Sequence, residues 1–323
     1  MPAQTITDPE FAARALAAGH LVALPTETVY GLGGNALNPE AVAAIFAAKN
    51  RPSFDPLIMH QATAERILAY AATVPEAARK LAEAFWPGPL TMVLPRTNAV
   101  PDLVTSGLPT VALRVPAHPV VREVLAAVDF PVAAPSANPF GFVSPTRAEH
   151  VAAQLGERIP YILDGGPCTV GLESTIVAFP NGEPTVLRKG GLAVERIEKV
   201  LGRKVAVRTH GSSRPEAPGM LSQHYSPGVP LELVERLAPD HAFPKHAAAI
   251  VYARGGELEW ERDGTWFYDL SPAGEEAEAA RRLFAVLRTL ADRAFRVAVV
   301  EMLPERGLGR AINDRLRRAA SRG

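Results

Sequence analysis

The residues of this sequence best suited to chemistry are cations and small hydroxyls that recur beside apolar segments. KNRPSFDPLIMH, residues 49–60, supplies Lys49 and Arg51, two cations within three residues. Arg offers a planar fork of hydrogen-bond donors and Lys a point charge, and both suit phosphate groups. A solvated basic turn would explain one such pair in isolation, but it does not explain several polar clusters of this kind.

Further polar clusters stand next to other apolar segments. PTETVYGLGGNA, residues 25–36, carries three hydroxyls, one carboxylate and three glycines, a composition that fills a core poorly. PSANPFGFVSPT, residues 135–146, carries small hydroxyls suited to close binding of phosphate or ribose. TVALRVPAHP places Arg114 in an apolar strand, where it needs an anionic partner from the protein or from a ligand. GLESTIVAF and VLRKGG add Ser174, Thr175, Arg188 and Lys189.

These residue types predict phosphoryl or nucleotidyl chemistry that works by positioning and charge stabilisation, with Mg2+. A covalent hydrolase is disfavoured because no nucleophile stands with an obvious base, and the residues indicate no general base. The eight histidines lack metal-ligand spacing. The single cysteine, Cys168, has no base or cation beside it in GGPCTVG, so we interpret it as structural.

Alternating helices and strands must position these clusters. Asp8 with Pro9, and Asn38 with Pro39, are start signals for helices in DPEFAARALAAG and NPEAVAAIFAAKN. PEAARKLAEAFW and LAVERIEKVLG predict two more helices. Apolar segments predict strands in HLVALPT, LTMVLPR, TVALRVP, PVAAPS, PYILDGG, STIVAFP and PTVLRK. This pattern indicates an α/β domain with a covered sheet, and prolines beside several strands disfavour an all-parallel one.

The chain divides into a catalytic domain over residues 1–205, a linker over 206–230 and a smaller α/β domain over 231–323. The linker is rich in Gly, Ser and Pro. It also carries Met220 and His224, followed by Tyr225, which a passive spacer does not need. In the last part, PLELVER, HAAAIVYA, TWFYDL and RVAVVEMLP predict strands, and GEEAEAARRLFAVLRTLADRAF and GRAINDRLRRAAS predict helices.

Composition and charge narrow the class of protein. The 323 residues have a formal net charge of zero, which argues for neither a nucleic-acid nor a membrane partner. Residues 281–323 nevertheless hold eleven Arg against four acidic residues. No run of eighteen apolar residues occurs, and MPAQTITDPE does not resemble a signal peptide. One cysteine fits a reducing compartment, so we expect a cytoplasmic protein.

A dinucleotide site is an alternative, because GLGGNA fits G-x-G-x-x-A and Asp55 follows about twenty residues on. Three observations disfavour it. ETVY separates the strand from the first glycine, the helix start signal lies at Asn38 rather than inside the glycines, and Asp55 does not end a strand.

The motifs together resemble one family. PTETVYGLG, K-x-RP-x-x-DPLIMH, the Arg of TVALRVPAHP, SAN…G…SPT and the ST of GLESTIV, in this order, are similar to the threonylcarbamoyl-AMP synthase family with its YrdC-like domain. APGMLSQHYSP and GLGRAINDRLRRAA resemble the linker and ending of its long form. The resemblance implies a twisted open mixed sheet with helices, plus a smaller Rossmann-like α/β C-terminal domain, with the linker closing over the site.

The resemblance also implies an activity. Family members make threonylcarbamoyl-adenylate and pyrophosphate from L-threonine, bicarbonate or CO2, and ATP with Mg2+. A separate transferase complex then modifies the adenosine beside the tRNA anticodon, and tRNA is not required for the first reaction. We expect Mg2+ to be held mainly by the ATP phosphates rather than by protein ligands.

Site residues follow from the matched motifs. The resemblance gives Lys49 and Arg51 the catalytic role. The residues implied for threonine are Thr28, His60, Arg114, Ala134 and Ser174. Those implied for ATP are Lys49, Arg51, Asp55, Thr110, Ser136, Ser144, Arg188 and Tyr225. The chain departs from the family pattern at Asp55, where many relatives have Asn, and at Phe140, where the SAN loop often has Ser.

Rival hypotheses remain open at this point. The Arg-rich ending and a cationic concave surface could belong to an RNA-binding module, although a solvated helix face explains GRAINDRLRRAASR equally well. A carbamoyl-adenylate enzyme of the hydrogenase-maturation type is a second rival. Those proteins carry extra acylphosphatase and zinc-finger regions, which this chain lacks.

Overall fold

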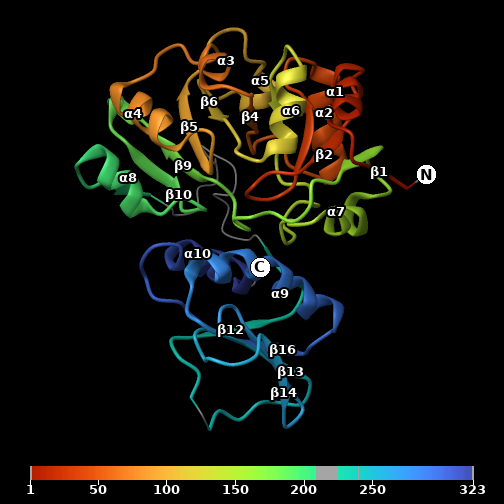
Figure 1. The fold of residues 1–323 in the computed structure, drawn as a ribbon, viewed down its shortest axis with the longest axis vertical. Coiled ribbons are helices and arrows are strands. Elements are labelled where there is room, and N and C mark those ends of the chain that lie inside the picture. The colour runs from red at the N-terminus through yellow and green to blue at the C-terminus, as the bar shows by residue number, and fades with distance from the viewer. Residues whose placement is uncertain (1, 209–224, 239, 322–323) are drawn as a thin grey trace.

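The computed structural model describes residues 2–208, 225–238 and 240–321. Two bodies stack along the long axis of the molecule (Figure 1). The larger contains the N-terminus, and the smaller is formed by the C-terminal part of the chain. His224 and Met220 of the expected linker lie outside the described residues, whereas Tyr225 is described. Among the described residues, no helix combines the length and the apolar character needed to cross a bilayer.

The described helices comprise ten α-helices and one 3-10 turn. Their bounds are α1 Pro9–Ala17, α2 Pro39–Lys49, α3 Ala64–Leu68, α4 Glu76–Phe85, α5 Asp102–Thr105, α6 Pro119–Ala127, α7 Ala148–Leu155, the turn Pro180–Gly182, α8 Val194–Leu201, α9 Glu276–Asp292 and α10 Gly309–Ala320.

The described strands form two sheets. The first sheet contains β1 Gln4–Ile6, β2 Val22–Leu24, β3 Gly31–Asn35, β4 Ile58–His60, β5 Leu90–Pro95, β6 Thr110–Arg114, β7 Val132–Ala133, β8 Tyr161–Leu163, β9 Thr175–Ala178, β10 Thr185–Arg188 and β11 Ala206–Val207. The second contains β12 Leu231–Val234, β13 Ala247–Val251, β14 Glu259–Arg262, β15 Thr265–Asp269 and β16 Val297–Glu301.

The first sheet is mixed, as the prolines beside its strands predicted. Its order is β1-β8-β2-β3-β7-β4-β6-β5-β9-β10-β11. β4 runs parallel to β6 but antiparallel to β7, and β5 runs antiparallel to β6 but parallel to β9. Helices α3, α4, α5 and α6 lie over the outer side of the larger body (Figure 1). The short central strands end at neighbouring positions, which brings their loops together.

The helix start signals act as predicted. The Asp8 carboxylate accepts a hydrogen bond from Glu10 N at 2.9 Å, with Pro9 at the first helical position. The Asn38 side chain accepts from Glu40 N and Ala41 N at 2.9 and 3.2 Å. These caps satisfy backbone donors that have no partner within the helix.

The glycines of PTETVYGLGGNA form a strand rather than a loop. β3 pairs antiparallel with β2 and with β7, which excludes the strand–turn–helix geometry of a dinucleotide fingerprint. A Cβ on Gly33 would lie 2.7 Å from Leu24 Cδ1, and one on Gly34 would lie 3.1 Å from Leu21 Cδ2. The space beside these two glycines is filled by Leu24 and Leu21, so packing inside the sheet disfavours a larger side chain at either position.

The second sheet has the order β12-β16-β13-β15-β14, and only β14 is antiparallel to its neighbour. One face packs on both α9 and α10 through an apolar core that includes Ile250, Leu283 and Leu316. The other face is covered by a smaller cluster around Leu237, Val251 and other side chains. Both helices therefore lie on the side that faces the larger body (Figure 1).

Candidate active site

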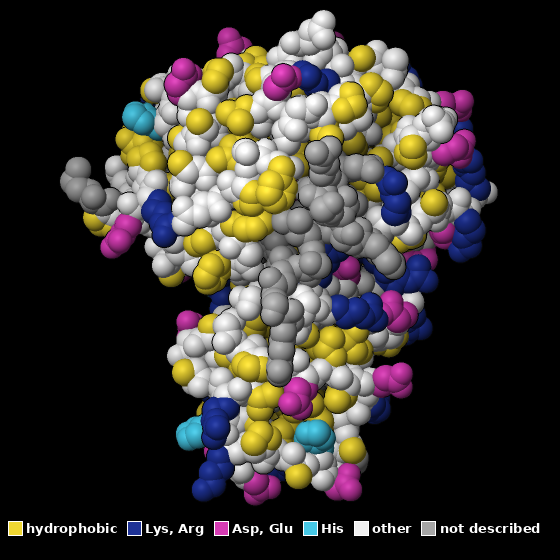
Figure 2. All heavy atoms as spheres, turned by 180° about the vertical axis from the view of Figure 1, so that it is seen from behind, with side chains coloured by type: hydrophobic (Ala, Val, Ile, Leu, Met, Phe, Trp, Pro, Cys, Tyr) yellow, Lys and Arg dark blue, Asp and Glu magenta, His cyan; other side chains and the backbone are white. Residues whose placement is uncertain are grey.

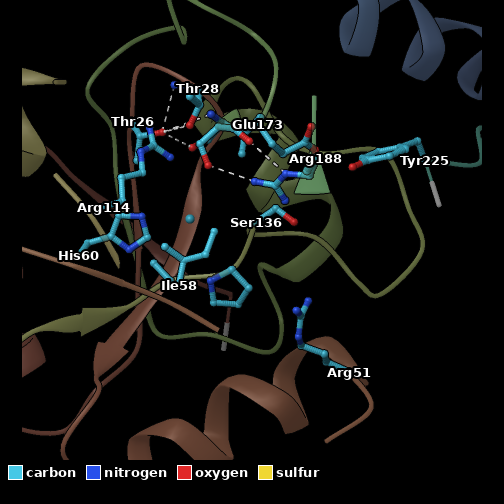
Figure 3. A pocket seen from close by; sticks show the side chains of 15 residues that line it. Thr26, Thr28, Arg51, Ile58, His60, Arg114, Ser136, Glu173, Arg188 and Tyr225 are labelled. Carbon is cyan, nitrogen blue, oxygen red and sulfur yellow. Dashed lines mark hydrogen bonds between the residues drawn. The ribbon is translucent and has the colours of Figure 1, made fainter. Parts of the chain in front are cut away.

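A cavity with about 580 Å3 of empty space, part of it open to solvent, lies where the central strands of the first sheet end. It is lined by Thr26, Thr28, Val29, Gly31, Arg51, Ile58, His60, Arg114, Ala134, Pro135, Ser136, Glu173, Ser174, Arg188 and Tyr225. Figure 3 shows these side chains around the cavity, with His60 and Arg114 on the left of the view and Arg51 and Tyr225 toward its right.

Arg114 and His60 lie side by side because β4 and β6 pair in register, with His60 opposite Arg114. Arg114 Nη2 donates to Glu27 Oε1 at 2.6 Å, and Nε donates to Gly88 O at 3.3 Å. The sequence required an anionic partner for Arg114, and in the described chain Glu27 supplies it. Burial would raise the pKa of Glu27, but the charge and hydrogen bond of Arg114 outweigh this and lower it.

The turn before β3 is held by Thr26. Its Oγ1 donates to Val29 O at 2.6 Å and lies 2.8 Å from Thr28 Oγ1. The backbone N–H groups of Thr28 and Val29 donate to Thr26 Oγ1. This local network fixes the hydroxyl of Thr28 at the cavity wall.

His60 is buried and its Nδ1 makes no hydrogen bond within the described chain. Burial, helped by the positive charge of Arg114, lowers the pKa of His60 to about 3. The ring is therefore neutral at physiological pH, and its buried nitrogen lacks a protein partner. A buried polar atom left without a partner costs free energy unless a ligand or a water satisfies it.

Arg188 supplies the cation at the far end of the cavity. β10 is irregular between Val186 and Arg188, which re-aims the side chain at the strand end. Arg188 Nε donates to Ser174 O at 3.0 Å and Nη2 to Ser174 Oγ at 3.1 Å. Ser174 Oγ also lies 2.7 Å from Thr91 Oγ1. Burial lowers the pKa of Arg188 to about 10, so the guanidinium remains charged.

Arg51 reaches the cavity from the loop after α2. Its Nη2 pairs with Asp55 Oδ2 at 2.9 Å and donates to Pro56 O at 2.9 Å. Asp55 is therefore a partner for Arg51, which gives this departure from the family pattern a structural role. Burial raises the pKa of Asp55 despite the nearby cations. Its Oδ1 has no hydrogen-bond partner within the described chain.

Lys49 is buried beneath the loop 135–146. Its Nζ donates to Ser136 O at 2.5 Å and to Asn138 O. Burial, followed by the charge of Arg51, lowers the pKa of Lys49 well below its usual value. In this arrangement Lys49 supports the loop that carries Ser136, and it is not part of the cavity lining.

The cavity brings together most of the residues that the motifs implied. All five expected for threonine line it, as do four of those expected for ATP: Arg51, Ser136, Arg188 and Tyr225. Lys49, Asp55, Thr110 and Ser144 are not among the lining residues. Thr110 begins β6 opposite Pro95, at the end of that strand away from Arg114. Ser144 is buried and donates to Glu173 Oε1 at 2.6 Å. Phe140 is half-buried, and its backbone N–H donates to Lys49 O at 2.9 Å.

Two carboxylates were not chosen from the sequence: Glu173, which lines the cavity, and Glu27, which lies between the lining residues Thr26 and Thr28. From the sequence, Glu27 was counted in its polar cluster but was given no role. Glu173 of GLESTIV was given no role either. Glu27 could have been found from the sequence, because the buried Arg114 was expected to need an anionic partner. Glu173 had no comparable local signal, because its main partner is Arg315, 142 residues later in the chain.

The described residues contain no group of three or more His, Cys, Asp or Glu side chains that could hold a metal ion. Glu27 is engaged by Arg114 and by Ala117 N at 3.0 Å. Glu173 is engaged by Ser144 and Arg315. The donor set thus does not fit a protein-held metal at the cavity.

Comparison with known proteins identifies the family. The family model described as "Telomere recombination" (Sua5/YciO/YrdC) matches residues 14–190, and the model described as "Threonylcarbamoyl-AMP synthase, C-terminal domain" matches residues 192–321. Threonylcarbamoyl-AMP synthase of Pyrococcus abyssi is 42% identical over 94% of this chain and 91% of its own. The enzyme of the same name from Bacillus subtilis is 39% identical over 97% and 93%.

A solved structure agrees over the whole length. Sua5 of P. abyssi in complex with L-threonine superposes with a TM-score of 0.88 at 36% identity, covering 99% of this chain and 98% of that one. The shared fold and the named relatives define a class, enzymes of the nucleotidyltransferase type built on a YrdC-like domain. Within that class, the chain belongs to the threonylcarbamoyl-AMP synthase family, in the form with the additional C-terminal domain. The family resemblance of the sequence motifs is confirmed.

Proposed function

We propose that this chain condenses L-threonine, bicarbonate or CO2, and ATP to threonylcarbamoyl-AMP and pyrophosphate. The observation that supports the proposal is that one cavity is lined by all five residues expected for threonine and by four of those expected for ATP. Relatives of similar length carry the name of this activity, and one was solved with L-threonine.

The threonine end of the cavity would be formed by Thr28, His60, Arg114, Ala134 and Ser174. Arg114 Nε and Nη2 bond to the protein, so Nη1 is left for a substrate carboxylate. The unpartnered Nδ1 of His60 offers a second polar contact. A neutral histidine and a paired arginine give this end little net charge, which suits a zwitterionic amino acid.

The ATP end would be formed by Arg51, Ser136, Arg188 and Tyr225, supported from behind by Lys49, Asp55 and Ser144. We place Thr110 at its periphery. Mg2+ would arrive with ATP, because the protein carboxylates at the cavity are already engaged. When bound, the metal supplies charge neutralisation on the phosphates.

In the proposed reaction the threonine amine attacks CO2 with loss of a proton, or attacks bicarbonate with loss of water, to form a carbamate. A carbamate oxygen then attacks the α-phosphate of ATP, the bond to the β-phosphate oxygen breaks, and pyrophosphate leaves. Arg51 and Arg188 offset the negative charge that builds on the phosphates. Buried walls that include Tyr225 limit access of water to the labile carbamate and adenylate.

The product would be consumed by a separate transferase complex that modifies the adenosine beside the tRNA anticodon, in the cytoplasm. tRNA itself would not be needed for the first reaction. An RNA-binding role finds less support, because the basic helix α10 is engaged in ion pairs. Arg317 pairs with Glu305, Arg318 with Asp314, and Arg310 with Glu195.

The test is pyrophosphate release from ATP and Mg2+ with bicarbonate, while single amino acids are added in turn. The proposal expects release that requires both threonine and bicarbonate. Release without threonine would indicate a different acceptor. Absence of release in every condition, together with tight RNA binding, would favour the RNA-binding alternative.

A further inference from the structure

One side chain of the ending GLGRAINDRLRRAA reaches across the junction between the two bodies. Arg315 of α10 is fully buried. Its Nε and Nη2 both donate to Glu173 Oε2 at 3.0 Å, and its Nη1 donates to Lys189 O at 2.7 Å. Its own domain contributes Asp314, 2.9 Å from Nη1. Arg315 is thus tied to the catalytic domain by three hydrogen bonds.

Glu173 connects this contact to the cavity. It lines the cavity itself, and its second oxygen accepts a hydrogen bond from Ser144 Oγ at 2.6 Å. The next residue, Ser174, holds Arg188 through two hydrogen bonds. One carboxylate therefore lies between the C-terminal domain and the cationic end of the site (Figure 3).

Arg315 also contacts Tyr225, which belongs to the expected linker. The guanidinium carbon lies 5.3 Å from the centre of the Tyr225 ring. Phe284 of α9 stacks on the same ring, with the two ring centres 5.5 Å apart. Tyr225 is buried with a left-handed φ of 68°, so its conformation depends on surrounding contacts. Both aromatic and cationic contacts come from the C-terminal domain.

The negative charge of Glu173 explains why its ion pair with Arg315 would affect the binding of a phosphorylated substrate. A buried carboxylate at the cavity wall would repel phosphate oxygens and would compete for Arg188. Burial alone would raise the pKa of Glu173, but the charges of Arg315 and Arg188 and the hydrogen bond from Ser144 hold it at about 2. Glu173 is therefore ionised, and Arg315 balances it from outside the cavity lining.

We propose that Arg315 is a positioning residue for nucleotide binding: by pairing with Glu173 it neutralises a carboxylate at the cavity wall and holds Ser144 and Tyr225 in place. The nucleotide end of the site is then complete only when the C-terminal domain is docked. This inference rests on the proposed function for the identity of the nucleotide. It assigns the C-terminal domain a direct contribution to the site.

The central experiment compares Arg315→Met with Arg317→Met in the full chain. Arg317 lies two positions along the same helix and pairs with the exposed Glu305, so it serves as the matched control. Arg315→Met should raise the KM for ATP at least tenfold while the KM for threonine changes less than threefold. Arg317→Met should leave both constants unchanged. Equal increases in both constants, with a lower midpoint of thermal unfolding, would indicate a merely structural role and overturn the proposal.

A second variant separates charge balance from packing. Arg315→Met with Glu173→Gln removes the uncompensated carboxylate, so the KM for ATP should return to within about fivefold of the wild-type value. A double variant as impaired as Arg315→Met would contradict the charge argument. If Arg315→Met alone does not fold, the test uses the double variant and Arg315→Lys instead. The proposal then requires that the KM for ATP of both variants stays within about fivefold of the wild-type value.

Direct ATP binding separates failure of this inference from failure of the proposed function. Equilibrium dialysis of ATP with Mg2+ requires no turnover. Wild-type protein that binds ATP but releases no pyrophosphate with threonine would sink the proposed function, and the ATP affinities of the variants would still decide the role of Arg315. Active wild-type protein with an unaltered Arg315→Met variant would sink the inference alone.

Discussion

At the scale of single residues, the site is built from charges that are paired before any substrate arrives. Arg114 is held by Glu27 and Gly88, so its guanidinium is fixed in one orientation. A pre-oriented guanidinium loses less entropy when it binds a carboxylate. Removing Arg114 would therefore also leave the buried carboxylate of Glu27 without its ion-pair partner.

The first prediction concerns this pair. Arg114→Ala should raise the KM for threonine far more than the KM for ATP, because it removes a charge-assisted contact worth about 1.5–3 kcal/mol. By the relation of about 1.4 kcal/mol per tenfold, this corresponds to roughly 10- to 150-fold. Arg203→Ala, which removes an exposed pair with Glu183, is the control. Steady-state pyrophosphate release measures both constants, and equal effects on them would refute the assigned role.

A second prediction follows from the low pKa of His60. The unfolded chain takes up a proton near pH 6.5, whereas in the folded protein burial keeps His60 neutral down to about pH 3. The stability of the fold should therefore fall as the pH drops from 6.5, by up to about 1.4 kcal/mol per pH unit from this group.

The measurement compares urea unfolding of the wild type and His60→Gln at pH 7 and pH 5. The variant should lose less stability than the wild type over this interval. The exposed His20→Gln variant is the control. Identical losses in the wild type and His60→Gln would show that His60 is not held neutral.

At the scale of elements, the C-terminal helices dock on loops of the larger body through close backbone contact. Gly171 has a φ of 78°, and a Cβ there would lie 2.4 Å from Arg281 Cα and 2.7 Å from Ala280 O. Both atoms belong to the backbone of α9, which cannot move aside as a flexible side chain would. The loop therefore needs glycine for its conformation and also for its contact with α9.

The third prediction uses a matched glycine. Gly171→Ala should destabilise the protein and weaken ATP binding, because α9 carries Phe284, the stacking partner of Tyr225. Gly182→Ala has a similar φ of 81° but no atom within 4 Å of the added Cβ. It should cost only the backbone strain of about 1–2 kcal/mol. Urea unfolding and ATP dialysis distinguish the two variants, and equal behaviour would mean that docking of α9 does not depend on Gly171.

Many helices and strands could be predicted from local sequence signals. Several contacts that form the site, in contrast, join residues that are far apart in the sequence. The caps at Asp8 and Asn38 involve neighbours two or three residues away, so a short segment contains the whole interaction. β3 was missed because its glycines have no side-chain pattern, and their requirement comes from Leu24 and Leu21 on another segment.

The cavity residues were found because family motifs mark them, and the structure shows which of them share one space. The burial of Lys49 under the loop 135–146 could not be read from the sequence, since KNRPSF has the composition of an exposed turn. The Glu173–Arg315 pair joins residues 142 positions apart. No periodicity or spacing reports such a contact, and only the docking of two domains creates it.

At the scale of the whole molecule, the uneven charge of the chain is balanced by contact between its two bodies. Residues 281–323 carry eleven Arg against four acidic residues, although the formal net charge of the chain is zero. Arg315 and Arg310 pair part of that excess with Glu173 and Glu195 of the larger body. Seen from behind, basic and acidic side chains mix at the junction instead of forming one continuous basic surface (Figure 2).

The last prediction concerns RNA. Binding to a polyanion requires cations that can neutralise several phosphates, and its affinity then falls steeply with salt. Because arginines of α10 are paired within the chain, unmodified tRNA should bind only weakly at 150 mM salt, and adding it should not change the rate of threonine-dependent pyrophosphate release. Fluorescence anisotropy with labelled tRNA across a salt series measures the first expectation. Arg317→Met, which removes one paired cation of α10, should not alter the result. Tight tRNA binding that depends steeply on salt, and that is weaker in Arg317→Met, would contradict this prediction. It would show that the ion pairs of α10 open and that its arginines bind RNA.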